Sequence, residues 1–198
     1  MAETRLGVAI LAAGQSRRFG ETDKLTARLQ GRMLGEHVVQ TLRGRDFSMA
    51  AVICASDTHP CAPAWRECGF DIVVNPDAEQ GMGTSVAMAA RLAMEADCDR
   101  LLIALADMPM VPEAFYSSLI LAVDSPASIA TSAIGDTRMP PAVFGSDHFP
   151  TLTQLHGDKG ARELLAFGET CPCPPEWLVD VDTPETLAAL EAGVRSPS

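Results

Sequence analysis

The chain has 198 residues, of which 47% are hydrophobic and 21% are charged, and this composition excludes intrinsic disorder because enough apolar surface can be buried to offset the lost conformational entropy. The formal net charge of −11 argues against non-specific binding to nucleic acid or to an anionic membrane. No apolar run approaches the roughly eighteen residues of a membrane span and the first residues lack a signal-peptide layout, so we expect one cytoplasmic domain over residues 1–198.

Short apolar runs alternate along the chain with stretches of helical character. The runs are typical of buried parallel strands, because they are apolar throughout and turn residues bound several of them. The predicted strands are Leu6–Leu11, Ala51–Ala55, Phe70–Val74, Leu101–Ala106, Ser128–Ser132 and Trp177–Val181. The predicted helices are Leu34–Leu42, Thr84–Ala96, Pro112–Val123, Ala161–Phe167 and one that begins near Thr183, and a further element covers Asp147–Leu155. This alternation predicts an α/β fold with a mostly parallel sheet and helices on both faces.

The loop after the first strand carries the most informative segment. In sheets of this kind ligands bind outside the carboxyl ends of the strands, where this loop begins. The segment is Leu11-Ala-Ala-Gly-Gln-Ser-Arg-Arg-Phe-Gly-Glu-Thr-Asp-Lys24, and its spacing fits neither a P-loop nor a dinucleotide-binding glycine motif. Small residues that let the backbone approach a ligand come first, and positive charges that could neutralise phosphates follow. They are Ala12, Ala13, Gly14, Arg17, Arg18 and Lys24.

An ordinary surface loop with solvated basic residues is the alternative interpretation of this segment. The small number of lysines favours a phosphate site over this alternative. The chain has thirteen arginines and only two lysines, Lys24 and Lys159. Both lysines lie in loops that contain glycine. A lysine ammonium is a compact and flexible charge that can follow a moving phosphoryl group.

The six cysteines and four histidines form no metal-ligand pattern. Neither Cys171-Pro-Cys173 nor the spacing of Cys54, Cys61 and Cys68 matches a zinc site. A chain of this length can build its core without disulfides, so we expect reduced and mostly buried thiols. The histidines are scattered, and the sequence assigns no role to any of them.

Aspartates follow two further predicted strands. Asp107 comes directly after the run Leu101–Ala106, where it is either a ligand of a divalent cation or a residue that initiates a turn. Asp180 and Asp182 are two residues apart at the end of the predicted strand Trp177–Val181, so both side chains point to one face. The residues that follow are typical of a helix start, and capping is therefore the alternative role for Asp182.

The segment Gly81-Met-Gly-Thr-Ser85 precedes the predicted helix Thr84–Ala96. Backbone N–H groups at a helix start have no partner within the helix, and here they could bind a base edge or a ribose oxygen. A simple turn with an N-cap is the alternative.

The first loop, with the pattern Leu-Ala-Ala-Gly-x-Ser-x-Arg-Phe-Gly-x-x-x-Lys, resembles the signature of nucleotidyltransferases with a Rossmann-like, sugar-nucleotide type fold. Further matching motifs follow in the expected order over nearly the whole chain. They are Asn75-Pro76 with Gly81–Ser85, Ala106-Asp-Met-Pro109, Pro140-Pro-Ala-Val-Phe144, Gly157-Asp-Lys-Gly-Ala-Arg162 and Asp180-Val-Asp-Thr-Pro-Glu185. The last three resemble the molybdenum cofactor cytidylyltransferase family, whose guanylyltransferase relatives share the first loop. The chain departs from the common pattern at Gly83, because many relatives bring a serine to the following helix sooner.

The resemblance implies a three-layer Rossmann-like fold of the nucleotide-diphospho-sugar transferase type. It also implies transfer of a nucleoside monophosphate from a nucleoside triphosphate (NTP) to a phosphate-bearing acceptor, with Mg²⁺ as cofactor and pyrophosphate as product. Residues 1–110 would then form the nucleotide-binding part and residues 111–198 the acceptor-binding part. CTP and molybdopterin are the expected substrates, and a molybdoenzyme is the expected recipient of the product. The alternatives are GTP as donor, a sugar or polyol phosphate as acceptor, or a non-catalytic nucleotide- or cofactor-binding module.

The same resemblance implies roles for individual residues. Lys24, with Arg18, would hold the triphosphate, while Asp107 and Asp182 would bind Mg²⁺ with support from Asp180. The expected nucleotide contacts are Leu11, Ala12, Ala13, Gly14, Arg18, Lys24, Asn75, Gly81, Ser85 and Asp107. The expected acceptor contacts are Pro141, Asp158, Lys159 and Arg162.

Overall fold

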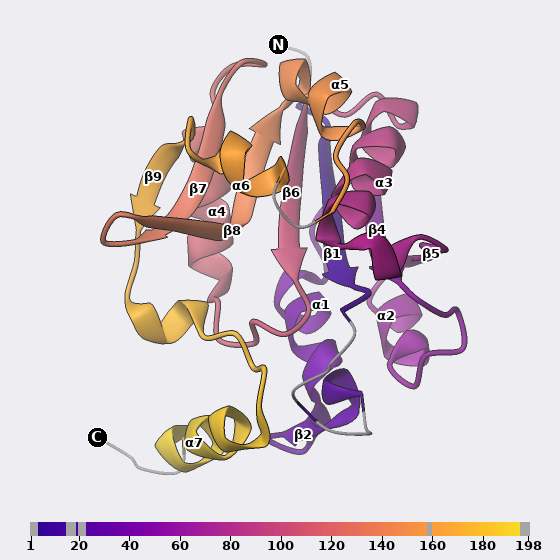
Figure 1. Ribbon diagram of the computed structural model, residues 1–198, viewed down its shortest axis with the longest axis vertical. Coiled ribbons are helices and arrows are strands. Elements are labelled where there is room, and N and C mark those ends of the chain that lie inside the picture. Colours follow the sequence, from indigo (N-terminus) through magenta and orange to yellow (C-terminus); the bar gives the residue numbers. More distant parts are fainter. Residues whose placement is uncertain (1–3, 15–18, 20–22, 158–159, 195–198) are drawn as a thin grey trace.

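The computed structural model describes residues 4–14, 19, 23–157 and 160–194, and over these residues the main sheet has the strand order β5-β4-β1-β6-β8-β7-β9 (Figure 1). Its strands are β1 (Leu6–Ala12), β4 (Met49–Cys54), β5 (Asp71–Val74), β6 (Arg100–Leu105), β7 (Ile129–Ile134), β8 (Thr137–Gly145) and β9 (Glu169–Pro172). β8 runs antiparallel to β6 and β7, whereas the other neighbouring strands pair in parallel. The predicted α/β fold with a mostly parallel sheet is confirmed.

Strands β1 and β6 form the buried centre of this sheet. Every residue of β1 after Leu6 is buried, and so is every residue of β6 after Arg100. The parallel register pairs Leu11 with Leu105, so both strands end at the same edge, in the lower half of Figure 1. The residues at the carboxyl ends of the two strands are therefore neighbours in space.

Helices cover both faces of the sheet (Figure 1). One face carries α3 (Met82–Glu95), α5 (Phe149–Leu152) and α6 (Gly160–Leu165), and α3 packs against both of its partners. The other face carries α1 (His37–Leu42), α2 (Ala62–Glu67) and α4 (Glu113–Ala122). An ion pair between Arg45, just after α1, and Glu113 of α4 links two of these helices. The three-layer arrangement expected from the sequence is confirmed.

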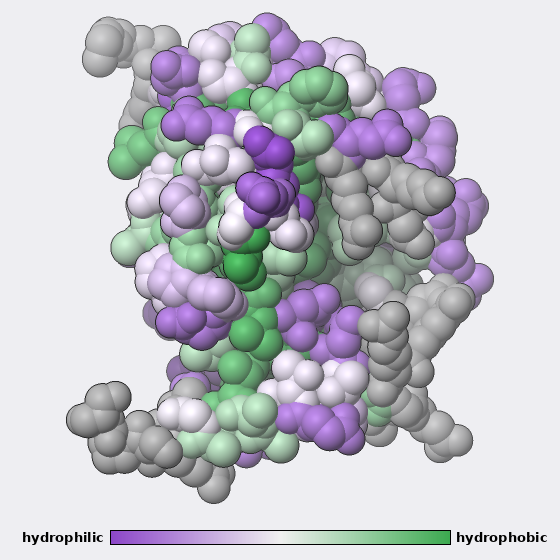
Figure 2. Space-filling model, turned by 60° about the vertical axis from the view of Figure 1, so that its left-hand side comes forward, coloured by the Kyte–Doolittle hydropathy of each residue, from purple (hydrophilic) through white to green (hydrophobic). Residues whose placement is uncertain are grey.

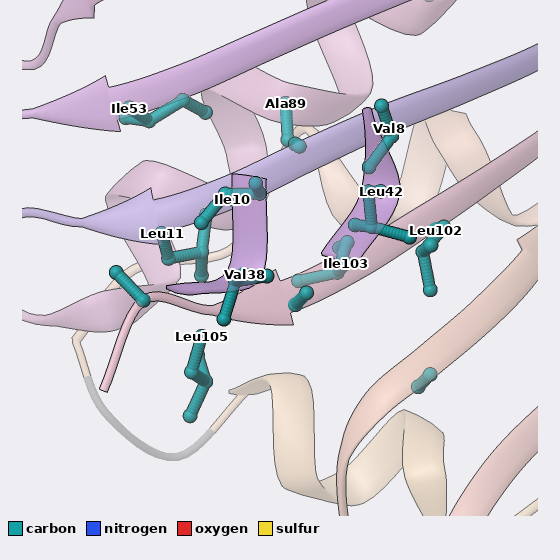
Figure 3. Close-up of a cluster of buried hydrophobic side chains, with 14 of the residues drawn as sticks. Val8, Ile10, Leu11, Val38, Leu42, Ile53, Ala89, Leu102, Ile103 and Leu105 are labelled. Carbon is teal, nitrogen blue, oxygen red and sulfur yellow. The ribbon is translucent and has the colours of Figure 1, made fainter. Parts of the chain in front are cut away.

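The hydrophobic core fills both spaces between the sheet and its helices (Figure 3). Alternate side chains of a strand point to opposite faces, so β1 and β6 each contribute to both halves of the core. Full burial of one such aliphatic side chain stabilises the fold by about 1.5–3 kcal/mol. The labelled members of this cluster are Val8, Ile10, Leu11, Val38, Leu42, Ile53, Ala89, Leu102, Ile103 and Leu105.

One predicted strand is wrong. The segment Trp177–Val181 pairs with no strand in the described part of the chain, and residues Pro175–Leu178 instead form a 3₁₀ turn. Pro175 favours this turn, because its fixed φ suits the first residue of a helical turn, and the turn takes up Trp177 and Leu178.

The sequence prediction missed the short hairpin strands β2 (Arg28–Leu29) and β3 (Arg32–Met33), and it missed two strands of the main sheet, β8 and β9, because of proline. β8 contains Pro140 and Pro141, which lie where the β7–β8 register shifts between Thr131 and Ser132. β9 ends at Pro172 and forms an edge of the sheet. Bulges and edges are the positions at which a sheet tolerates proline. The sequence also missed α2, and it left open the element over Asp147–Leu155, which is a 3₁₀ turn followed by α5.

A small hairpin and the last helix lie together below the sheet in Figure 1. The hairpin consists of β2 (Arg28–Leu29) and β3 (Arg32–Met33), and α7 (Pro184–Val194) packs against β2. On the face seen in Figure 2, a narrow band of hydrophobic residues runs between hydrophilic ones. Among the described residues, no helix is both long enough and apolar enough to span a membrane.

Candidate active site

Four charged side chains meet beyond the carboxyl ends of β1 and β6, and we call Lys24, Asp107, Asp180 and Asp182 the carboxylate cluster. The Nζ atom of Lys24 lies 2.5 Å from Asp107 Oδ2, 2.6 Å from Asp182 Oδ1 and 3.7 Å from Asp180 Oδ1. The Lys24 side chain is 7% exposed, whereas those of Asp180 and Asp182 are 45% and 42% exposed. The cluster is therefore closed behind the lysine and open to solvent beside the two later aspartates.

Backbone hydrogen bonds bring the three aspartates together. The N–H of Ala106 donates to the carbonyl of Leu11 at 3.0 Å, which extends the β1–β6 pairing up to Asp107. The N–H of Val181 then donates to the carbonyl of Asp107, also at 3.0 Å. Because Val181 is fully buried, the aspartates on either side of it are held next to Asp107.

Burial and neighbouring charges shift the pKa values of Lys24 and Asp180 in the cluster. Burial by itself would lower the pKa of Lys24, but the Asp107 charge and hydrogen bonds to Asp107 and Asp182 raise it, so the ammonium stays protonated. Burial, and after it the negative charge of Asp107, raises the pKa of Asp180 to about 7. Above that pH, three carboxylates surround one ammonium and the cluster carries a net charge of −2.

The donor set fits a hard divalent cation. One carboxylate oxygen from each of Asp107, Asp180 and Asp182 can be chosen so that the three atoms lie within 4.8 Å of one another. Mg²⁺ binds oxygen at about 2.1 Å, so opposite ligands stand about 4.2 Å apart and a small inward shift or a water completes the fit. The buried Oδ1 of Asp107 has no hydrogen-bond partner, which is a cost that a cation would remove. Lys24 contacts the same carboxylates, so a cation would compete with the ammonium for them.

Thr183 provides a side-chain cap at the start of α7. The hydroxyl of Thr183 accepts a hydrogen bond from the Thr186 N–H at 3.2 Å, and this is a capping bond at the start of α7. The carboxylate of Asp182 bonds to Lys24. Asp180 and Asp182 thus share the same side of the chain, as the sequence predicts, although the segment is extended rather than paired in a sheet.

A second part of the candidate site is held by hydrogen bonds between uncharged side chains, and for these bonds we call residues Asn75–Ser85 the neutral turn, although the segment also contains Asp77 and Glu79. Asn75 is 3% exposed, and its amide Nδ2 donates to Thr84 Oγ1 and to Ser85 Oγ, both at 2.9 Å. Its Oδ1 accepts the Asp77 N–H at 3.0 Å. Asn75 and Ser85 therefore hold the shape of the turn, and contact with a nucleotide stays a prediction for both.

The helix α3 begins two residues earlier than the sequence predicts. Gly81 occupies the N-cap position with φ 111°, a left-handed conformation that favours glycine. The N–H of Gly83 donates to the carbonyl of Gly157 at 2.7 Å. A Cβ atom on residue 83 would lie 2.5 Å from that carbonyl oxygen, so the crossing of residues 156–157 requires glycine there. Gly83, the position that departs from the family pattern, thus joins the neutral turn to the segment that leads into residues 158–162.

The remaining predicted contacts fall into three groups. Leu11 and Ala12 are buried at the end of β1, and Gly14 is exposed beyond them. Arg18, Asp158 and Lys159 lie outside the described residues, as does the side chain of Arg162. Pro141 is buried in β8, where its carbonyl accepts the Ser132 hydroxyl at 2.6 Å. The site roles of all these residues stay predictions.

An apolar pocket lies between α3, α6 and three strands of the sheet. Its described lining comes from β1, α3, β6, β8 and α6, and all of these lining side chains are apolar. The residues are Leu11, Met82, Val86, Ile103, Pro140, Ala142, Phe144 and Leu165. It borders the end of β1 and the start of α3, where the sequence places the nucleotide.

Comparisons with known proteins agree with this arrangement. The family model described as MobA-like NTP transferase domain matches residues 8–172. The purine catabolism protein PucB of Bacillus subtilis is 32% identical over 193 residues, which cover 88% of this chain and 90% of PucB. The molybdenum cofactor guanylyltransferase of Shewanella frigidimarina is 24% identical over 194 residues, 94% of this chain and 95% of that protein.

A solved structure shares the whole fold. The crystal structure of Rv0371c from Mycobacterium tuberculosis superposes with a TM-score of 0.73 at 28% identity, covering 97% of this chain and all of that one. Its complex with manganese superposes with a TM-score of 0.72 at 24% identity, covering 96% and 99% of the two chains. With its fold, its strand-end carboxylates and this family match, the chain belongs to the MobA-like NTP transferase family of nucleotidyltransferases.

Proposed function

We propose that this protein transfers CMP from CTP to the phosphate of a molybdopterin-type acceptor, in a Mg²⁺-dependent reaction that releases pyrophosphate. The carboxylate cluster is the observation that carries this proposal. It combines a buried ammonium with three carboxylates at the edge of the sheet where such folds bind ligands. A site of net negative charge would repel a triphosphate unless a cation came with it, which supports a metal-bound nucleotide.

The chemistry needs no general base. An acceptor phosphate oxygen is already an anion near neutral pH, so it can attack the α-phosphorus directly. A new bond forms between that oxygen and the α-phosphorus, while the bond to the α–β bridging oxygen breaks and pyrophosphate leaves with the electron pair. The protein must supply in-line positioning and charge neutralisation.

The cluster can divide these tasks among its members. In the proposal, Asp107 and Asp182 hold Mg²⁺, and Asp180 supports them from the same side. When bound, the cation would neutralise charge on the triphosphate. Lys24 would turn from the carboxylates toward the phosphates, and a flexible lysine stem suits that movement.

The rest of the site follows the division expected from the sequence. Residues 1–110 would bind the nucleotide, with the loop that starts at Leu11 on one side and the neutral turn on the other. Arg18 would place a second positive charge beside the triphosphate. Residues 111–198 would bind the acceptor through Pro141, Asp158, Lys159 and Arg162, and a molybdoenzyme would receive the product.

Two observations support these substrates. The later motifs resemble those of molybdenum cofactor cytidylyltransferases, and they cover the acceptor side. Molybdenum cofactor guanylyltransferases match over almost their full length, which also makes GTP the main alternative donor.

The experiment is a pyrophosphate-release assay that crosses four NTPs with molybdopterin, a sugar phosphate and a polyol phosphate, with and without Mg²⁺. We expect release only with Mg²⁺, fastest with CTP and molybdopterin. Asp147→Asn is the matched control for cluster variants, because Asp147 is an exposed acid near the opposite edge of the sheet. Faster release with GTP would change the donor, and no release with any pair would reject the proposed function.

A further inference from the structure

A histidine outside the carboxylate cluster is bonded to the residue that precedes Lys24. Both carboxylate oxygens of Asp23 are used: Oδ1 accepts the Leu25 N–H at 2.9 Å, and Oδ2 pairs with His59 Nε2 at 2.8 Å. His59 lies in the loop between β4 and α2, 36 residues further along the chain. The contact therefore ties the start of the Lys24 turn to a separate part of the fold.

The surroundings of His59 fix which ring nitrogen carries the proton. Nδ1 faces the Cys61 N–H at 3.0 Å, and that contact is a hydrogen bond only if Nδ1 accepts. The proton therefore resides on Nε2, which donates it to Asp23. A tautomer change would bring two N–H groups together at Cys61, so the direction of the Asp23 contact is set.

The ring itself is held in place. It stacks on Trp65 with ring centroids 4.7 Å apart and an angle of 18° between the planes. Trp65 is fully buried, and its Nε1 donates to the Gly35 carbonyl at 2.8 Å. The His59 side chain is 8% exposed. Asp23 is thus bonded to a fixed group rather than to a mobile surface side chain.

The turn that carries Lys24 needs such support. Residues Lys24–Thr26 form a single 3₁₀ turn, which has little stability of its own. Thr26 bonds to the Asp23 carbonyl through both its N–H, at 3.0 Å, and its hydroxyl, at 2.7 Å. The backbone and side chain of Asp23 therefore organise the whole turn, and His59 anchors that side chain.

We propose that His59 is a positioning residue for Lys24 and acts through Asp23 to hold the Lys24 turn against the carboxylate cluster. The proposal rests on the proposed function, because it gives a role to the position of Lys24. Misplacement of a reacting group by about 1 Å can cost roughly 100-fold in rate. Loss of the His59 contact leaves Lys24 itself intact, so we expect a smaller loss of about tenfold.

The test compares His59→Phe with His59→Gln in the pyrophosphate-release assay. Phenylalanine keeps a flat ring on Trp65 but loses both hydrogen bonds, whereas a glutamine amide can still donate to Asp23. We expect His59→Phe to lower kcat about tenfold with an unchanged acceptor KM, and His59→Gln to restore most of kcat. His148→Phe is the matched control, because His148 bonds the Ala127 carbonyl through Nε2 at 2.8 Å and contacts no part of the Lys24 turn among the described residues, and we expect wild-type kcat.

Asp23→Asn tests the same contact from the other side. It leaves an oxygen for the Leu25 N–H but sets an amide NH₂ against the His59 Nε2–H, and the Cys61 contact prevents a compensating tautomer change. If His59→Phe does not fold, Asp23→Asn tests the positioning role of His59 in its place. We expect the same loss of kcat. Wild-type kcat in a folded His59→Phe or Asp23→Asn protein would overturn the proposal, and so would equal losses in His59→Phe and His59→Gln.

A second readout separates this inference from the proposed function. Mn²⁺ affinity of the nucleotide-free protein reports the hold of Lys24 on the carboxylates, whether or not any NTP reacts. A loosened lysine competes less, so we expect His59→Phe to bind Mn²⁺ several-fold more tightly than wild type. Unchanged Mn²⁺ affinity would overturn the positioning role even if the wild-type enzyme proved inactive.

Discussion

The carboxylate cluster and the neutral turn are built in opposite ways. The cluster joins charged side chains from three segments far apart in the sequence, and two of its aspartates are about half exposed. The neutral turn is mostly local, and its buried Asn75 uses its amide groups on the turn itself. One region can change its partners when a ligand arrives, whereas the other keeps a fixed backbone shape.

This difference indicates a division of labour. Charges that can exchange partners suit a step in which negative charge moves between phosphates. A rigid turn suits recognition, because its shape is set before the ligand binds. Variants of the cluster should therefore lower kcat. Variants of the turn should instead raise the KM of the substrate whose binding segment they displace.

The largest effect is expected from Asp107→Asn. The change removes one carboxylate from the candidate cation site, and loss of one preorganised electrostatic contact typically costs about 10²–10³ in rate. Raising Mg²⁺ should recover part of the activity, because mass action offsets weaker cation binding. The measurement is the initial rate of pyrophosphate release against Mg²⁺ concentration, with circular dichroism as the folding control.

Lys24→Ala is the comparison for this variant. It leaves all three carboxylates in place, so extra Mg²⁺ should recover little of its lost activity. Near-wild-type rates for Asp107→Asn at low Mg²⁺ would mean that Asp107 is only a turn residue.

The charged region was largely predictable from the sequence. Lys24 lies in the loop after one predicted strand and Asp107 directly follows another, and parallel strands end at one edge, so the α/β pattern predicts both at the same edge of the sheet. Asp180 and Asp182 were predicted on one face, although the supporting strand Trp177–Val181 does not form. The contact of Lys24 with the aspartates themselves was not predicted, because the sequence suggested only a partnership with phosphates.

A smaller effect is expected at the neutral turn from Gly83→Ala. The added Cβ would lie 2.5 Å from the Gly157 carbonyl oxygen, and backbone on both sides must shift. Overpacking of this kind costs about 1–3 kcal/mol in stability. We expect about a tenfold rise in acceptor KM, because the displaced segment leads into the predicted acceptor contacts.

Gly145→Ala is a matched control for this prediction. A Cβ there would lie 2.3 Å from the Pro126 carbonyl oxygen, at the opposite edge of the sheet beside the start of β6. It should lower the melting temperature without a rise in acceptor KM. Equal KM changes in the two variants would show that Gly83 has no particular link to the acceptor side.

The contacts of the neutral turn and of His59 were beyond sequence reasoning. Gly83 meets residues 156–157, and Asp23 meets His59 at a separation of 36 residues. No periodicity or local motif encodes such pairs, because they depend on how loops from different strands cross. The prolines of β8 and β9 prevented the prediction of these two strands for a related reason. Whether a residue lies at a bulge or at an edge depends on how the strands pair in the folded sheet.

The smallest effect is a pH-dependent change in stability on Asp180→Asn. The pKa of Asp180 is about 7 in the folded protein and about 3.9 in an unfolded chain. The folded state therefore binds this proton more tightly, and the stability gained from it is lost as the pH rises from about 4 through 7. Asparagine removes that loss, so the variant should exceed wild type in melting temperature at pH 8, and by a smaller amount at pH 5.

The side chain is half exposed, so the gain at pH 8 should be only about 1–3 °C. Asp147→Asn removes the same charge elsewhere and controls for overall repulsion. Mg²⁺ should raise the wild-type melting temperature at pH 8 and remove the difference. A gain that is larger at pH 5 than at pH 8 would contradict the raised pKa.

The most direct test of the cation site is equilibrium binding of Mn²⁺ to the nucleotide-free protein and to Lys24→Met. In wild type the ammonium lies 2.5 Å and 2.6 Å from oxygens of Asp107 and Asp182, so a cation must displace it. We expect one bound Mn²⁺ per chain and several-fold tighter binding in Lys24→Met. Equal or weaker binding in Lys24→Met would show that the three carboxylates do not form the cation site.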